Sequence, residues 1–154
     1  MLSSEQGEEN KDSTIWDRST LYGMKCAFLS GYGDRMMQPL LAYCHKRLVC
    51  DCVPYAVEAY PEGGKRHLSG ESALFVRVIT EGMFGIVPEG LDSFSFVPML
   101  YEGFSHLYLY SVSICGECYD IKIDPDKWQV FCDDNLIASG VTDHQRVYIR
   151  KNTI

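Results

Sequence analysis

The chain has 154 residues, of which 46% are hydrophobic and 23% charged, so it can build a real core and is not a disordered polymer. Its 21 acidic and 14 basic residues give a net charge of −7, which argues against nucleic acid as a partner. No window approaches the ~18 apolar residues that cross a membrane. The first ten residues are acidic and polar and do not resemble a secretion signal, so the cytoplasm is the default compartment. The sequence does not establish the compartment.

Seven cysteines are present, an odd number that leaves at least one outside any disulfide scheme. Two pairs, Cys115-x-x-Cys118 and Cys50-x-Cys52, could together offer four thiolates to a zinc ion. However, C-x-C is a poor spacing for zinc, and Cys118 begins an alternating strand. Buried, inert thiols are the favoured interpretation, and we expect no metal and no other cofactor.

The order of hydrophobic patterns predicts an α+β fold. Residues 1–12 are expected to be a disordered acidic tail, residues 13–90 to be helical, and residues 91–154 to form a β domain. In the β domain, short alternating segments separated by polar turns indicate an antiparallel sandwich or meander. Strands are expected around residues 94–96, 107–110, 119–123, 128–132, 136–139 and 147–149.

The first two helices are predicted from apolar stripes. A helix over residues 14–30 would place one set of side chains on one face, and Gly31 would end it. That set is Leu21, Met24, Cys26 and Phe28, with Trp16 at the start. Asp34 is expected to cap a second helix, in which Pro39 fits only the first turn. Its stripe is Met37, Leu40, Leu41, Cys44 and Leu48.

A third helix over residues 70–83, capped by Ser69, is apolar on most sides and is therefore expected to be buried on most sides. If its neighbours are missing from the chain, an apolar patch would be left exposed, which favours association. The side chains of that patch would be Phe75, Val78, Ile79 and Met83.

The connection over residues 51–70 concentrates polar chemistry between two apolar helices. Within it, Glu58-x-Tyr60 is followed by Leu68-Ser69 at the start of a helix. This order resembles the glucoamylase-type glycosidases, in which an E-x-Y loop supplies the catalytic base and an L-S pair opens the last barrel helix. Residues 81–88 resemble the EG-x-x-GI-x-P helix exit of the wider six-hairpin group of glycosidases and disaccharide phosphorylases. Residues 94–100 resemble that group's F-x-x-x-P-x-L strand into a C-terminal β-sandwich.

The resemblance spans roughly residues 14–125 and implies the last helices of an (α/α)6 toroid followed by the β-sandwich. It also implies inverting hydrolysis of O-glycosidic bonds by two carboxyl groups about 6.5–9.5 Å apart, one a general acid and the other a general base.

Under the resemblance, Glu58 is the catalytic base and Tyr60 orients it. Arg66, His67 and Glu71 would contact sugar hydroxyls or support the loop. Structural interpretations stand beside these roles: Glu58 could be an exposed loop carboxylate, Arg66 a solvated cation and His67 a structural hydrogen-bonding group. For Glu71, a first-turn acid favoured by the helix dipole is the preferred interpretation.

Twelve helices with their loops need at least about 200 residues, whereas this sequence offers three helix candidates. The helices that would carry the general acid are absent. The resemblance therefore predicts a C-terminal glycosidase fragment that is inactive alone. Its partners would be carbohydrate and either a separate N-terminal barrel polypeptide or a second copy of the chain. The alternative is a non-catalytic carbohydrate-binding or structural module, with a sugar platform built from Tyr101, Tyr108 and Tyr110.

Overall fold

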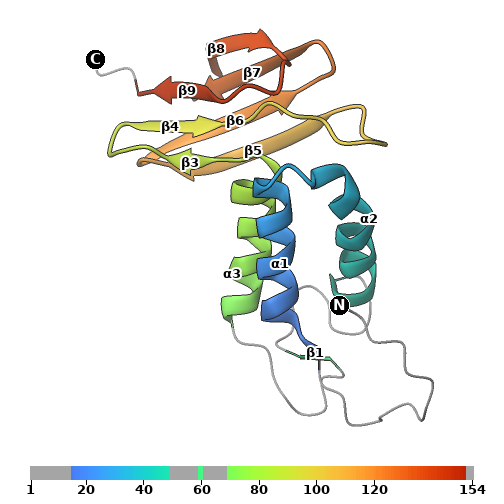
Figure 1. Cartoon of the computed structure of the whole chain (residues 1–154). Coiled ribbons are helices and arrows are strands. Elements are labelled where there is room, and N and C mark those ends of the chain that lie inside the picture. Colours follow the sequence, from blue (N-terminus) through green and yellow to red (C-terminus); the bar gives the residue numbers. More distant parts are fainter. Residues whose placement is uncertain (1–14, 49–58, 61–68, 152–154) are drawn as a thin grey trace, which may run out of the picture.

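The computed structural model describes residues 15–48, 59–60 and 69–151 (Figure 1). The fold is α+β, as the order of patterns predicted: helices come first and antiparallel strands follow. In Figure 1 the helices stand together on one side of two stacked sheets, and α3 leads directly into the first strand of the β part.

The described residues of the helical part form three α-helices, and two of them continue as π-helical turns. Their bounds are α1 Asp17–Leu29, α2 Gly33–Tyr43 followed by η1 Cys44–Leu48, and α3 Ser69–Arg77 followed by η2 Val78–Met83. A short antiparallel ladder joins β1 Ile15–Trp16 to β2 Ala59–Tyr60. Within the described ranges, no helix is both long and apolar enough to cross a membrane.

The buried face of α1 explains its place against α2, α3 and η2. Leu21, Met24 and Phe28 are buried at the spacing of one helical stripe. The prediction that Cys26 shares this face was wrong, because Cys26 is exposed. Two residues along an α-helix correspond to roughly 200°, which turns Cys26 away from both Met24 and Phe28.

Two predictions about α2 were also wrong. The helix begins at Gly33, so Pro39 lies in its second turn, where it can donate no hydrogen bond to the preceding turn. Met37 and Leu40 are buried on the same helix, and this burial offsets the missing hydrogen bond. Asp34 does not cap the helix. It lies in the first turn, and its carboxylate accepts a hydrogen bond from the backbone N–H of Glu102 (2.9 Å).

The third helix is buried on one side, and not on most sides as its composition predicted. Val78 and Met83 are buried, and Phe75 and Ile79 are half-buried, whereas Val76 is exposed. The toroid is not confirmed, because the described helices pack around α1 and against the β part. Much of the apolar patch that suggested self-association is thus used inside the fold.

The β part contains two antiparallel sheets. The smaller has the order β3-β4-β9, with β3 Val87–Pro88, β4 Ser93–Phe96 and β9 Val147–Arg150. The larger has the order β5-β6-β7-β8, with β5 Leu107–Ile114, β6 Glu117–Ile123, β7 Lys127–Cys132 and β8 Asn135–Val141. All six predicted strands are present.

Aromatic side chains fill the space between the two sheets. The ring of Phe94 lies 5.0 Å from that of Tyr119, and the ring of Phe96 meets that of Trp128 edge-on at 5.4 Å, measured between centroids. Such geometry is favourable for aromatic pairs. The sandwich core is therefore built by alternate residues of β4, β6 and β7.

Tyr101 joins the helical part to the β part. Its ring packs edge-on against Phe28 (5.3 Å between centroids), and its hydroxyl donates to the carbonyl of Met83 (2.7 Å). A Cβ atom at Gly33 would lie 2.1 Å from the Tyr101 ring, so only glycine fits at the start of α2. Burial raises the pKa of the Tyr101 hydroxyl well above its usual range, which keeps this donor protonated.

Glu81 gives the helical part an acid-sensitive contact. Its carboxylate pairs with Arg77 (2.9 Å) and with Lys25 of α1. Hydrogen bonding to Arg77, aided by Lys25, lowers the pKa of the Glu81 carboxyl. When a carboxyl group has a lower pKa in the folded chain than in the unfolded chain, its charged form stabilises the fold at pH values above the unfolded pKa. This stabilisation is lost as the pH falls through the pKa of the folded chain.

We therefore expect Glu81→Gln to lower the melting temperature more at pH 7 than near pH 3, since the carboxylate loses its charge and its pairing with Arg77 and Lys25 as the pH falls through its lowered pKa. Melting curves recorded by circular dichroism at the two pH values measure the change in melting temperature. Glu102→Gln, at an exposed position, is the control, with a small effect at both. An equal loss for Glu81→Gln at both pH values would contradict the linkage.

Candidate functional site

The loop site predicted from the sequence lies mostly outside the described residues. Glu58, Arg66 and His67 fall in undescribed segments, so their roles stay predictions. Tyr60 is the second residue of β2 and pairs with Ile15 in the short ladder. The ladder brings the E-x-Y motif's tyrosine position next to the start of α1.

Glu71 has a structural role, because it joins α3 to α1. Its side chain is fully buried in the first turn of α3, and Arg18 of α1 donates two hydrogen bonds to its Oε1 atom (2.9 Å from Nε and 2.7 Å from Nη2). Nearby on α1, the buried Asp17 accepts a hydrogen bond from the Tyr43 hydroxyl (3.2 Å). These contacts tie the ends of three helices together, so the predicted sugar contact of Glu71 would compete with an ion pair.

A second candidate site lies on the outer face of the larger sheet, away from the sandwich core. We call it the aromatic face, formed by His106, Tyr108, Tyr110, Lys122 and Phe131. Tyr108 and Tyr110 are 40% and 56% exposed, large fractions for aromatic side chains. Exposed aromatic side chains that contact one another are the feature that marks a binding surface.

Lys122 lies at the centre of the aromatic face. Its Nζ atom is 4.9 Å from the ring centroid of Phe131, 5.5 Å from that of Tyr110 and 6.0 Å from that of Tyr108. These distances are within the range of cation–π attraction. Tyr108 also meets His106, with 4.7 Å between their centroids, and lies edge-on to Tyr110 at 6.2 Å. The rings are therefore held in place by one another and by one cation.

The register of the sheet explains how this cluster forms. Tyr108 is directly opposite Lys122 across β5 and β6, and Phe131 on β7 is opposite Asp120. A bulge follows between Leu109 and Val112. At this bulge Ser111 adopts a positive φ of 55°, and its backbone N–H donates to Asp120 (2.8 Å).

Two carboxylates flank the central cation: Asp120 shares a face of β6 with Lys122, because both alternate with the buried residues, and Asp124 directly follows the strand. Tyr108 donates its hydroxyl hydrogen to Asp124 (2.7 Å), and this bond raises the pKa of Tyr108, so the phenol stays protonated. Asp120 and Asp124 outnumber Lys122, so this part of the face carries a net negative charge at neutral pH.

The sequence located part of this face. Alternation predicted that Tyr108 and Tyr110 share a side of one strand, and the structure agrees. Tyr101, predicted in the same platform, is instead buried between the helical and β parts. Lys122 and Phe131 were missed, because only the pairing of β5, β6 and β7 brings them beside the tyrosines.

The described cysteines are free thiols, and Cys50 and Cys52 of the zinc hypothesis lie outside the described residues. Cys118 is exposed, whereas Cys115 donates weakly to the carbonyls of Gly90 and Ser93 (both 3.5 Å). The sequence did not anticipate a group in which possible ligand atoms of Glu117, Cys132 and Asp133 lie within 4.8 Å of one another.

Two observations argue against metal binding by Glu117, Cys132 and Asp133. Lys151 forms an ion pair with Glu117, which occupies one of the carboxylates. Burial, aided by Asp133 and Glu117, raises the pKa of the Cys132 thiol. A protonated thiol is neither a nucleophile nor a metal ligand at neutral pH.

Comparison with known proteins found no match to any family model, curated protein or solved structure. The resemblance to six-hairpin glycosidases therefore stays a prediction from the sequence motifs.

Proposed function

We propose that this protein is a non-catalytic module that binds neutral carbohydrate through the aromatic face. The observation that carries the proposal is the cluster of exposed Tyr108 and Tyr110 rings around Lys122, bordered by Asp120 and Asp124.

The chemistry of a sugar ring fits this arrangement. A pyranose presents apolar C–H groups on its faces and hydroxyl groups around its rim. Tyrosine rings offer a large contact area at low entropic cost, since only two χ angles are fixed. The carboxylates at the border of the rings can accept hydrogen bonds from sugar hydroxyls, and the ammonium group among the rings can donate hydrogen bonds to them.

The charge of the face favours a neutral sugar over a polyanion. The whole chain has a net charge of −7, and two carboxylates stand beside the one cation of the cluster. The net negative charge of the chain and the two carboxylates of the aromatic face would both repel a sulfated glycan or a nucleic acid.

A glycan array with the full chain, followed by calorimetry on the best glycan, tests the proposal. We expect Tyr110→Ala to weaken binding at least about tenfold, equivalent to ~1.4 kcal/mol, while Tyr110→Phe keeps most of the affinity because the ring remains. The matched control is Tyr148→Ala on β9 of the other sheet, where the tyrosine is 69% exposed. Equal losses in the Tyr110→Ala and Tyr148→Ala variants, or an array without a bound glycan, would refute the proposal.

A catalytically incomplete glycosidase is the second candidate function. It is favoured by the β1–β2 ladder, which seats Tyr60 of the E-x-Y motif beside the start of α1, where Asp17 is buried. Since the general acid is not among the predicted groups, we expect the glycans of the array to be bound and not hydrolysed. Release of reducing sugar that Glu58→Gln abolishes would contradict both candidates and would show that the chain is an active glycosidase.

A further inference from the structure

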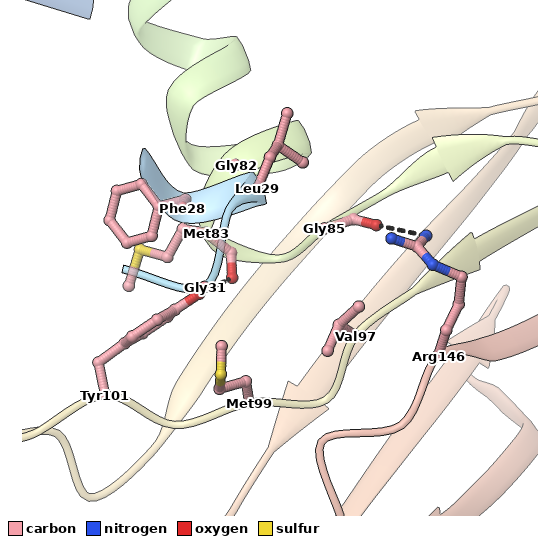
Figure 2. Close-up of a pocket in the computed structure, with 10 residues that line it drawn as sticks. All are labelled: Phe28, Leu29, Gly31, Gly82, Met83, Gly85, Val97, Met99, Tyr101 and Arg146. Atoms are coloured by element: carbon pink, nitrogen blue, oxygen red, sulfur yellow. Dashed lines mark hydrogen bonds between the residues drawn. The ribbon is translucent and has the colours of Figure 1, made fainter. Parts of the chain in front are cut away.

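A cavity of about 180 Å³ lies where the ends of α1 and η2 meet the chain that leaves β4 (Figure 2). It is lined by Phe28, Leu29, Gly31, Gly82, Met83, Gly85, Val97, Met99, Tyr101 and Arg146. For comparison, an engineered apolar cavity of about 150 Å³ holds one benzene molecule. The cavity is therefore large enough for a single ring or a short alkyl chain.

Among the described residues, the side chains that line this cavity are mostly apolar, backbone polar atoms contribute to its wall, and its ionisable side chains are one tyrosine and one arginine. Figure 2 shows Phe28, Met83 and Tyr101 on one side, Val97 across from them, and Met99 between Tyr101 and Val97. The Tyr101 hydroxyl is already used, since it donates to the carbonyl of Met83. Of the aspartates and glutamates that the structure describes, none lines the cavity, although acidic residues outnumber basic ones 21 to 14 in the chain.

Arg146 brings a positive charge to one end of the cavity. Its Nη1 atom donates to the carbonyl of Gly85 (3.2 Å, dashed in Figure 2) and to the hydroxyl of Ser95 (2.8 Å). Ser95 is fully buried and donates its own hydrogen to Glu89 (2.6 Å), which fixes the hydroxyl as an acceptor for Arg146. The guanidinium is thus held by two neutral oxygen atoms.

The remaining donors of Arg146 are open to a ligand. Within the described part of the chain, Arg146 forms no ion pair, and its Nε and Nη2 atoms donate to none of the described residues. A guanidinium binds carboxylates through two parallel hydrogen bonds from neighbouring nitrogen atoms. A fixed cation beside an apolar wall selects a ligand with one negative end and an apolar body.

We propose that this cavity binds a small monocarboxylate with an apolar body, such as an aryl-substituted propionate, with its carboxylate on Arg146 and its ring against Met83, Val97 and Met99. The site is separate from the aromatic face and does not depend on the proposed carbohydrate binding. A single cation and a net negative chain favour a monoanion over a phosphate or dicarboxylate.

Titration of the full chain with 3-phenylpropionate, followed by two-dimensional NMR of the amide groups, tests the proposal. For a ligand of this size we expect a dissociation constant of order 1 mM and shifts concentrated at the amides of Gly31, Gly82 and Gly85. We expect Arg146→Gln to weaken binding at least about tenfold. The matched control is Arg150→Gln, which removes an exposed arginine paired with Asp92 and should leave binding unchanged.

The uncharged analogue 3-phenylpropan-1-ol separates charge recognition from simple filling of the cavity. We expect it to bind at least tenfold more weakly than the acid in the wild-type chain, and equally weakly in Arg146→Gln. Equal binding of acid and alcohol to the wild type would overturn the proposal, as would shifts scattered away from the three glycines. The comparison of ligands needs no variant, so it holds even if Arg146→Gln perturbs the fold.

Discussion

Arg18→Met is expected to lower the free energy of unfolding by about 3 kcal/mol. The substitution keeps an apolar stem of similar length but leaves the buried Glu71 carboxylate without the guanidinium that donates two hydrogen bonds to it. Removing one partner of a buried ion pair costs about 3–5 kcal/mol. The lower end applies here, because the Arg18 side chain is 50% exposed and water already screens part of the interaction.

The double variant Arg18→Met with Glu71→Leu shows whether the uncompensated charge is the cause. Replacing both partners by apolar side chains removes the need to bury a charge, so most of the lost stability should return. Urea unfolding followed by circular dichroism gives the three free energies under one condition. A loss within about 0.5 kcal/mol for Arg18→Met, as for an ordinary surface substitution, would refute a structural role for the pair.

This ion pair also illustrates what the sequence could not show. Glu71 was recognisable as a first-turn acid of a helix, because helix starts have a local signature. Its partner Arg18 is 53 residues away in the chain, and no local pattern connects them. The interpretation of Glu71 as a sugar contact came from motif order alone, which carries no information about the packing of α1 against α3.

Local sequence patterns predicted which helices and strands are present better than they predicted where a helix begins. The apolar stripe of α1, apart from Cys26, and the ending at Gly31, with its positive φ of 80°, were correct, because both depend on neighbouring residues. The start of α2 at Gly33 was missed, and the reason for a glycine at this position is the close approach of the Tyr101 ring. Tyr101 belongs to another part of the chain, so this need for glycine comes from tertiary packing.

The two candidate binding sites also differ in how much of each a local sequence pattern reveals. Alternation in β5 revealed Tyr108 and Tyr110, whereas Lys122 joins them through a strand register that the sequence does not specify. The cavity at Arg146 had no signal in the sequence at all. It forms where Arg146 meets Gly85, 61 residues earlier, and glycine and arginine at such a distance have no recognisable spacing.

Phe96→Ala is expected to lower the free energy of unfolding by about 3–5 kcal/mol, the largest effect of any substitution considered for this chain. Phe96 is fully buried between the sheets and meets the ring of Trp128 edge-on. The cost depends on whether neighbours can move into the hole. Trp128 lies against Gly140, where even a Cβ atom would come within 2.6 Å of its ring, so the indole is closely held by the strand beside it.

Because Trp128 cannot easily shift, we expect the cavity left by Phe96→Ala to remain open and the melting temperature to fall by ~10 °C. Tyr148→Ala on the adjacent strand is the control, since Tyr148 is exposed and its removal should change stability by no more than about 0.5 kcal/mol. Each chain is measured with Trp16→Phe, so that Trp128 is the one tryptophan left and its fluorescence during urea unfolding reports on this part of the core. A loss below about 2 kcal/mol for Phe96→Ala would mean that the sandwich collapses around the hole, and that Gly140 does not hold the indole in place.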